Sequence, residues 1–344
     1  MGRNGELPVG GVQRSVDELQ VVPAPVVFCP FQPHISPYAA DVSRYAMAWA
    51  TRHGFLDTGA AAARFARAKF AYLAARAYPD ADKADLYLAM SVLTLIVMLD
   101  DHLESSLGRD PDGQRAAAAG VLSYLRGAPE SDHRAALAAA LTAPLAGAIG
   151  DVWTRLTART GPAWRARFVE HVARYLAANA WEADNRRAGR VPTIGEYLSM
   201  RRHSSATALF FDLIEALGAE LSGAVRSDPA LTVLVGHAHN IVAWFNDIVS
   251  WRKELRASDW HNMVLVVRNE LGVPRTEAVR RVAARHDAEV HAFVARRAAL
   301  PAEVRADPAV TRFITGLTYW IRGNIDWSRD SGRYAPPEGA AAGA

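Results

Sequence analysis

The chain has 344 residues, of which 50% are hydrophobic and 22% are charged, and its formal net charge is only +3. This composition is that of a folded globular protein, and the scattered basic residues argue against a nucleic-acid-binding surface. The single cysteine, Cys29, excludes an internal disulfide and a cysteine-built zinc site. We therefore expect no nucleic-acid partner and a reducing, cytoplasmic setting.

The two ends of the chain differ in composition from its middle. Residues 1–25 are rich in Gly, Pro and Val without periodicity, and residues 335–344 (APPEGAAAGA) are low in complexity. We expect a flexible N-terminal segment without the apolar run of a signal peptide, and a disordered C-terminal tail. Residues 26–334 are predicted to form one domain, because no repeat and no linker-like change in composition divides them.

The middle of the chain has the pattern of consecutive helices. Prolines separate stretches of roughly 12 to 30 residues in which apolar residues recur at helical spacing. Runs rich in Ala, Leu and Arg at 58–78 and 133–156 strengthen the pattern, because these are strong helix formers. No alternating pattern of strands and hairpin turns competes with it. The sequence predicts an all-α bundle.

A first acidic stretch follows the apolar run LAMSVLTLIVML at 88–99, which is too short to span a membrane. Asp100 and Glu104 then stand four residues apart and share one face of the helix, whereas Asp101 is turned about 100° away. Unpaired carboxylates at the end of a buried helix are costly, and a hard cation is one remedy. A solvated helix end remains the alternative.

A second polar stretch, WFNDIVSWRKE at 244–254, lies among apolar and aromatic residues. Asn246, Ser250 and Glu254 place three oxygen ligands suited to Mg²⁺ along about 12 Å of one helical face. Lys253 adds a positive charge beside them, which suggests a polyanion such as a diphosphate that bridges metals and cations. The polar face of an amphipathic helix is the alternative, although the flanks are too apolar for a freely solvated one.

Together the two stretches resemble the metal-binding motifs of the class I terpene synthases, particularly bacterial cyclases of about this length. In that family a DDxx(x)D/E motif faces an Asn-Asp-x-x-Ser-x-x-x-Glu motif across a central apolar cavity of an all-α bundle, and the two bind three Mg²⁺ with the substrate diphosphate. The resemblance covers the chain from about residue 27 onward. It implies the metal ligands Asp100, Glu104, Asn246, Ser250 and Glu254, with Asp247 matching the second motif's Asp.

The resemblance also implies which residues bind and sense the diphosphate. The sensing arginine is expected some 45 residues before Asn246, where both Arg201 and Arg202 fit, and the distance to the expected helix break favours Arg202. Lys253 matches a diphosphate-binding lysine of the family. Arg333 and Tyr334 match the pair that closes over the diphosphate.

The catalytic set implied by the resemblance also includes the helix break after the sensing arginine. Bacterial members usually have Asp-Gly there, with an exposed backbone carbonyl that helps to trigger ionisation. This chain has Ser205-Ala206, and Ala adopts a broken-helix backbone less readily than Gly. The expected catalytic residues are Arg202, Ser205, Ala206 and Tyr334.

Aromatic and aliphatic side chains near these motifs are candidates for the wall of the cavity, because ring faces stabilise cations without attacking them. Ordinary core packing is the alternative for each. Helical spacing from the motifs selects Ile96, Val97, Phe210, Phe211, Phe245, Trp320 and Trp327.

These features predict a Mg²⁺-dependent cyclase that ionises a linear prenyl diphosphate, in the first place farnesyl diphosphate, and acts as a monomer or homodimer without stable membrane insertion. A geranylgeranyl diphosphate cyclase, a chain-elongating prenyltransferase and a non-catalytic prenyl-binding protein are the alternatives, although the prenyltransferases have two aspartate-rich motifs instead. A histidine metal site at His237 and His239 is disfavoured, because residues two apart do not share a helical face.

Overall fold

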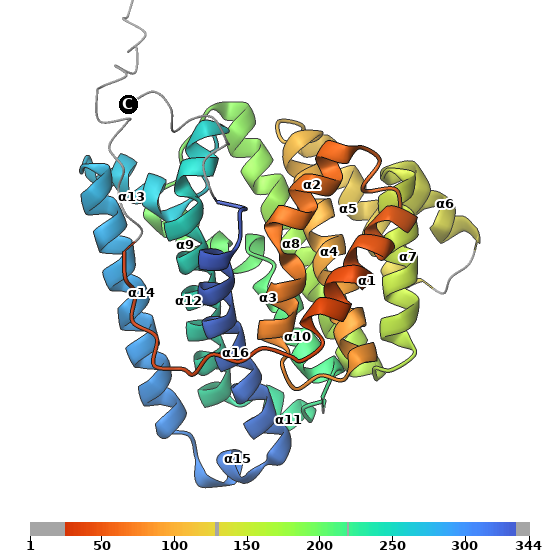
Figure 1. Cartoon of the computed structure of the whole chain (residues 1–344). Helices are drawn as coiled ribbons and strands as arrows, with labels where there is room; N and C mark the ends of the chain where they lie inside the picture. The colour runs from red at the N-terminus through yellow and green to blue at the C-terminus, as the bar shows by residue number, and fades with distance from the viewer. Residues whose placement is uncertain (1–24, 128–130, 219, 335–344) are drawn as a thin grey trace, which may run out of the picture.

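The computed structural model describes residues 25–127, 131–218 and 220–334. The tail 335–344 and all but the last residue of the segment 1–25 lie outside these ranges. Within them the chain forms sixteen α-helices and no β-strand (Figure 1). The prediction of an all-α fold is confirmed, and the division of the chain into one domain with two loose ends stays a prediction.

The helices follow one another with short connections. In chain order they are α1 (Ala39–Arg52), α2 (Gly59–Ala68), α3 (Phe70–Ala77), α4 (Lys83–Ser105), α5 (Pro111–Arg126), α6 (Ser131–Ala140), α7 (Ala143–Thr157), α8 (Pro162–Ala188), α9 (Ile194–Ser204), α10 (Thr207–Ala216), α11 (Gly223–Arg226), α12 (Pro229–Arg256), α13 (Met263–Leu271), α14 (Arg275–Ala298), α15 (Ala302–Ala306) and α16 (Pro308–Asp330).

Capping residues explain where the long helices begin. The side chain of Asp82 accepts a hydrogen bond from the Asp85 amide at the start of α4. Asp228 and Asp307 do the same for the first amides of α12 and α16, and each is followed by proline at the first helical position. A side-chain oxygen that satisfies a free N–H, followed by a proline that needs none, fixes a helix start. Of the prolines that separate the predicted helices, Pro111, Pro162 and Pro229 begin α5, α8 and α12.

The long helices pack side by side around the middle of the molecule. Helix α3 lies against α4 and α16, α16 against α12, and α10 against α8, α12 and α16. Helices α1 and α7 cover α4 from outside, and α14 runs along the outer side of α12 (Figure 1). The face of each inner helix that looks away from these outer layers is thus free to line a central space.

The buried apolar side chains form two clusters that meet along α12. The larger cluster includes the first half of α12 with α1, α3, α4, α7, α10 and α16, and the smaller includes its second half with α13 and α14. Large side chains such as Trp49, Trp164 and Phe293 are completely enclosed. Both clusters hold α12 along its length, which fixes the direction of its polar stripe.

One helix in the described part of the chain, α4, is long and apolar enough to cross a membrane by length and composition alone. Of its most apolar window, 67% is buried among the other helices. This burial identifies α4 as a core helix of the bundle, which explains why its apolar run continues almost without interruption up to Asp100.

Candidate active site

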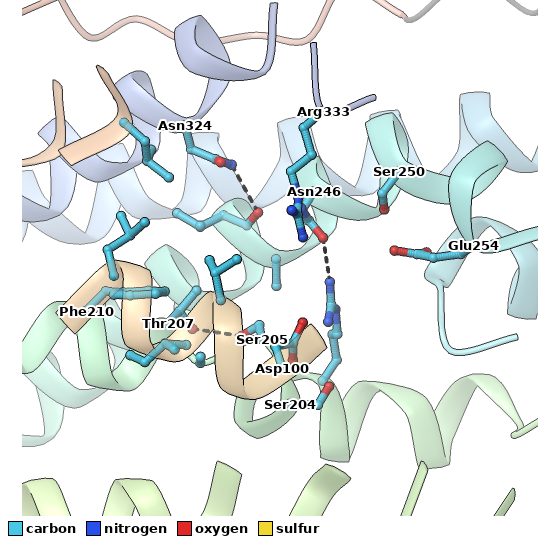
Figure 2. A pocket seen from close by; sticks show the side chains of 18 of the residues that line it. Asp100, Ser204, Ser205, Thr207, Phe210, Asn246, Ser250, Glu254, Asn324 and Arg333 are labelled. Carbon is cyan, nitrogen blue, oxygen red and sulfur yellow. Dashed lines mark hydrogen bonds between the residues drawn. The ribbon is translucent and has the colours of Figure 1, made fainter. Parts of the chain in front are cut away.

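The two polar stretches, 146 residues apart between Asp100 and Asn246, meet at a single cavity. Its lining includes Asp100 and Glu104 from α4 and Asn246, Ser250 and Glu254 from α12. Figure 2 shows Asp100 together with the three α12 residues. We call the α4 side the acidic rim and the α12 side the Asn/Ser/Glu rim. Each rim lies near the C-terminal end of a long helix whose earlier turns are largely buried and apolar.

The acidic rim carries carboxylates that repel one another. Asp100 accepts a hydrogen bond of 2.9 Å from the hydroxyl of Tyr175, which is itself buried. Burial and then the neighbouring Asp101 raise the pKa of Asp100, although the Tyr175 hydroxyl opposes this. Glu104 reaches the solvent, yet its protein surroundings and the Asp100 carboxylate raise its pKa to about 8. A cation bound between these groups would offset the repulsion.

The Asn/Ser/Glu rim is held by hydrogen bonds from several other elements. The Oδ1 atom of Asn246 accepts from Arg201 at 2.9 Å, and its Nδ2 atom donates to the Tyr334 hydroxyl at 2.8 Å. Ser250 and Glu254 both accept from the Asn262 amide. Burial and then the Asp247 carboxylate raise the pKa of Glu254 to about 7.

The donor chemistry of the two rims fits Mg²⁺. All five predicted ligands offer oxygen, and three of them are carboxylates whose pKa values are raised by burial and by other carboxylates. Among the residues that the structure describes, no three Asp, Glu, His or Cys side chains form a closed cage. Mg²⁺ is commonly held by one or two carboxylates together with substrate phosphates, and a divided site of this kind suits that arrangement.

The structure places Arg201 in the cavity and turns Arg202 away from it. The Arg201 guanidinium donates to Asn246 and, at 2.6 Å, to the buried Asp247, and that carboxylate raises its pKa further despite burial. Arg202 instead donates to Asn240 at 2.8 Å and is not part of the cavity lining. The preference for Arg202 was therefore wrong in position, because consecutive helical residues point about 100° apart. The 45-residue spacing to Asn246 selects the arginine that lines the cavity, and the role of either arginine as diphosphate sensor stays a prediction.

The break between α9 and α10 falls where the sequence predicted it. Ala206 has φ of 56° and ψ of 5°, which is the left-handed region, and Ser204, Ser205, Ala206 and Thr207 all line the cavity. That conformation costs a non-glycine residue roughly 1–2 kcal/mol, so the packing of α9 and α10 must hold it. The catalytic role of Ser205 and Ala206 stays a prediction.

The predicted diphosphate-binding residues also reach this end of the cavity. Lys253, Arg333 and Tyr334 are part of its lining. The Arg333 guanidinium lies 5.1 Å over the Phe70 ring and 4.0 Å from Asp101, and the Gly332 amide donates to the Arg67 carbonyl at 2.9 Å. The segment that follows α16 is thereby attached across α2 and α3 beside the acidic rim.

The opposite end of the cavity is apolar and aromatic, as predicted, with two exceptions. Ile96, Val97, Phe210, Trp320 and Trp327 line it, and the Phe210 and Trp320 rings stack at 4.9 Å. The predictions for Phe211 and Phe245 were wrong, since neither is in the lining. Their side chains turn away from the cavity on the same helices and pack against His239 and His286 at ring distances of 4.6 and 5.9 Å.

Sequence reasoning missed part of the lining. Helical spacing could have found several of these residues, since Val242 lies four before Asn246 and Asn324 four after Trp320. Asp259 and His261 lie in the connection between α12 and α13, where no helical repeat predicts which way a side chain points. The missed lining residues are Phe70, Leu73, Leu93, Glu182, Ser204, Thr207, Val242, Ala243, Asp259, His261 and Asn324.

The two histidines of the GHAHN stretch have separate partners. His237 lies 2.6 Å from Glu289 of α14, whereas His239 lies 2.6 Å from the Thr207 hydroxyl. Burial lowers the pKa of His239 to about 3, so it stays neutral in the core. Neither histidine lines the cavity.

Known proteins are similar to this chain in both sequence and fold. Residues 91–292 match the family model described as terpene synthase family 2, C-terminal metal binding. The (+)-T-muurolol synthase of Roseiflexus castenholzii is 37% identical, over 89% of this chain and 92% of that protein. The 10-epi-cubebol synthase of Sorangium cellulosum is 32% identical, over 91% and 98% respectively.

Solved structures give the same result. Germacradien-4-ol synthase from Streptomyces citricolor superposes with a TM-score of 0.76 at 27% identity, over 88% of this chain and 97% of that one. Wild-type cucumene synthase superposes with a TM-score of 0.74 at 27% identity, over 88% and 99% respectively. The fold of this chain is therefore the all-α bundle of the class I terpenoid synthases, and the two rims lie at its cavity. The chain belongs to the terpene synthase family, which confirms the resemblance drawn from its motifs.

Proposed function

We propose that this protein is a Mg²⁺-dependent cyclase that ionises farnesyl diphosphate and closes the resulting carbocation to a cyclic C15 terpene, with release of diphosphate. The observation that carries the proposal is the division of one cavity into a charged end and an apolar, aromatic end. The relative (+)-T-muurolol synthase is described as cyclising (2E,6E)-farnesyl diphosphate, which supports this choice of substrate.

The charged end would bind the diphosphate. Asp100, Glu104, Asn246, Ser250 and Glu254 would hold Mg²⁺, three ions in our proposal, and the bound metal would neutralise the negative charge that develops on the leaving diphosphate. Arg201, Lys253 and Arg333, which also line the cavity, would add fixed positive charge at this end. These fixed cations need little reorganisation when the allylic C–O bond breaks, and they therefore lower the barrier to ionisation.

The apolar end would hold the hydrocarbon chain and its cation. The stacked rings of Phe210 and Trp320, with Trp327 beside them, offer π faces and no nucleophile. Arg333 and Tyr334 would keep water out, because Tyr334 is tied to Asn246 across the mouth and packs on Trp327 at 5.8 Å. The same enclosure gives no reason for an association with nucleic acid or membrane, and we propose a cytoplasmic monomer or homodimer.

Incubation of the purified protein with MgCl₂ and C10, C15, C20 or C25 prenyl diphosphates, followed by gas chromatography with mass spectrometry, tests the proposal. We expect a cyclic C15 product with farnesyl diphosphate and none when EDTA replaces MgCl₂. A product from the C20 substrate alone would assign the protein as a diterpene cyclase instead. Absence of product from every substrate would contradict a catalytic role and favour a prenyl-binding protein.

A parallel reaction with isopentenyl diphosphate separates cyclisation from chain elongation. Elongation requires a second substrate, so a cyclase gives the same product with and without it. A longer prenyl diphosphate in the supplemented reaction would favour a chain-elongating prenyltransferase.

A further inference from the structure

Asn262 lies outside the motifs and outside the cavity lining, yet it contacts the Asn/Ser/Glu rim. It is completely buried and stands at the start of α13, after the connection that leaves α12. Its carbonyl oxygen Oδ1 accepts from the Val264 amide at 2.9 Å and thereby caps α13.

The cap fixes the orientation of the Asn262 side chain. Because Oδ1 must face the Val264 amide, the Nδ2 group must face α12. There it lies within hydrogen-bond distance of the Asp247 carbonyl at 2.9 Å, Ser250 Oγ at 3.3 Å and Glu254 Oε2 at 2.5 Å. The Oδ1 atom of Asn262 therefore caps α13, while its Nδ2 atom contacts the side chains of Ser250 and Glu254 on the rim.

These contacts restrict Ser250 and Glu254 without occupying all their oxygens. Glu254 keeps its second carboxylate oxygen, and Ser250 keeps a lone pair, for a ligand in the cavity. Hydrogen bonds from outer residues orient metal ligands, and their loss typically weakens metal binding about 10- to 100-fold. A serine and a glutamate on an exposed helix face would instead sample several rotamers.

We propose that Asn262 is a positioning residue that holds Ser250 and Glu254 in their metal-binding orientation and couples the start of α13 to the Asn/Ser/Glu rim. The proposal rests on the metal-binding function proposed above for that rim. Asn262 acts through other side chains and does not touch the substrate.

Variants that keep or remove the cap separate positioning from stability. Asn262→Ser keeps an oxygen that can cap α13 but removes the amide donor, whereas Asn262→Ala removes both. Asp307→Ala is the matched control, because it removes the side-chain cap of α16 roughly 20 Å along the helix from Trp320. Melting temperatures without metal measure the loss of stability in each variant.

The decisive measurement is the affinity of each variant for Mg²⁺ together with inorganic diphosphate, determined by calorimetry. We expect Asn262→Ser and Asn262→Ala to weaken it about 10- to 100-fold, and Asp307→Ala to leave it unchanged despite a lowered melting temperature. Wild-type binding by Asn262→Ser would overturn the positioning role alone. Absence of binding by the wild-type protein would overturn the metal assignment as well.

A double-mutant cycle adds a test that a merely structural role would fail. If Asn262 acts through Ser250, then Asn262→Ser should weaken binding less in a Ser250→Ala background than in the wild type. The same comparison is made in a Glu254→Gln background. If Asn262→Ser weakens binding by the same factor in the wild-type, Ser250→Ala and Glu254→Gln backgrounds, the proposal is contradicted.

Discussion

The two rims of the cavity supply similar oxygen atoms but differ in how firmly the protein holds them. On the Asn/Ser/Glu rim, Asn246 is bonded to Arg201 and Tyr334, and Ser250 and Glu254 are both bonded to Asn262. On the acidic rim, within the part of the chain that the structure describes, Asp100 accepts a side-chain hydrogen bond from the Tyr175 hydroxyl, and Glu104 makes none.

We expect this difference to give the two rims different roles in binding the diphosphate. A ligand set that is already oriented loses little conformational freedom when it binds, so its affinity depends on its supporting residues. A loosely held set can move onto its ligand, but part of the interaction energy is then used to order it. We expect the Asn/Ser/Glu rim to define where the diphosphate sits and the acidic rim to close onto it.

The largest effect is expected from removing a charge on the firmly held rim. Glu254→Gln keeps the shape of the side chain but removes one carboxylate, and it should lower kcat/KM about a thousandfold, whereas Glu104→Gln should lower it about tenfold. Product formation from farnesyl diphosphate at saturating Mg²⁺ measures both. Circular dichroism controls for folding, and equal losses in the two variants would remove the distinction between the rims.

The next largest effect concerns the arginine that holds Asn246. Arg201→Lys keeps a positive charge beside Asp247 but loses the planar group that reaches two acceptors, and we expect kcat/KM to fall about a hundredfold. Arg202→Lys is the matched control, because its side chain donates to Asn240 and does not line the cavity. It should change kcat/KM less than about threefold. The reverse order would restore Arg202 as the sensing residue.

The contrast between these two arginines shows what the sequence could and could not determine. That the proposed ligands of each rim face one cavity was predictable, because residues four apart on a helix share a face whatever surrounds them. Neighbouring residues such as 201 and 202, or 210 and 211, differ only in helix rotation, which depends on packing against other elements. Asn262 was out of reach for a related reason, since only the folded connection after α12 brings it back to the rim.

A smaller effect links the rims to pH in the absence of metal. Glu254 has a pKa of about 7 and Glu104 one of about 8, both above the ordinary value, so the folded state keeps protons that the unfolded state loses. Their contribution to stability is present below about pH 4.5 and is lost as the pH rises through these values.

Melting temperatures of the two Gln variants relative to wild type check this sign. Gln carries no charge, so each variant should match wild type near pH 4 and exceed it by at least about 2 °C at pH 8.5. The excess should level off at lower pH for Glu254→Gln, near pH 7, than for Glu104→Gln, near pH 8. Addition of MgCl₂ with inorganic diphosphate should abolish or reverse the advantage, because the wild-type carboxylates then have a cation to bind.

The smallest expected effect comes from the single support of the acidic rim. Tyr175→Phe removes the hydroxyl that donates to Asp100, and the loss of one such hydrogen bond, about 1 kcal/mol, should raise the Mg²⁺ concentration for half-maximal activity about fivefold. The counterpart on the other rim is Tyr197→Phe, which removes the donor to Asp247 at 2.9 Å. Asp247 keeps Arg201 and the Met263 amide, so this change should affect the Mg²⁺ requirement less than Tyr175→Phe does. A larger shift for Tyr197→Phe would mean that the Asn/Ser/Glu rim is held less redundantly than its hydrogen bonds indicate.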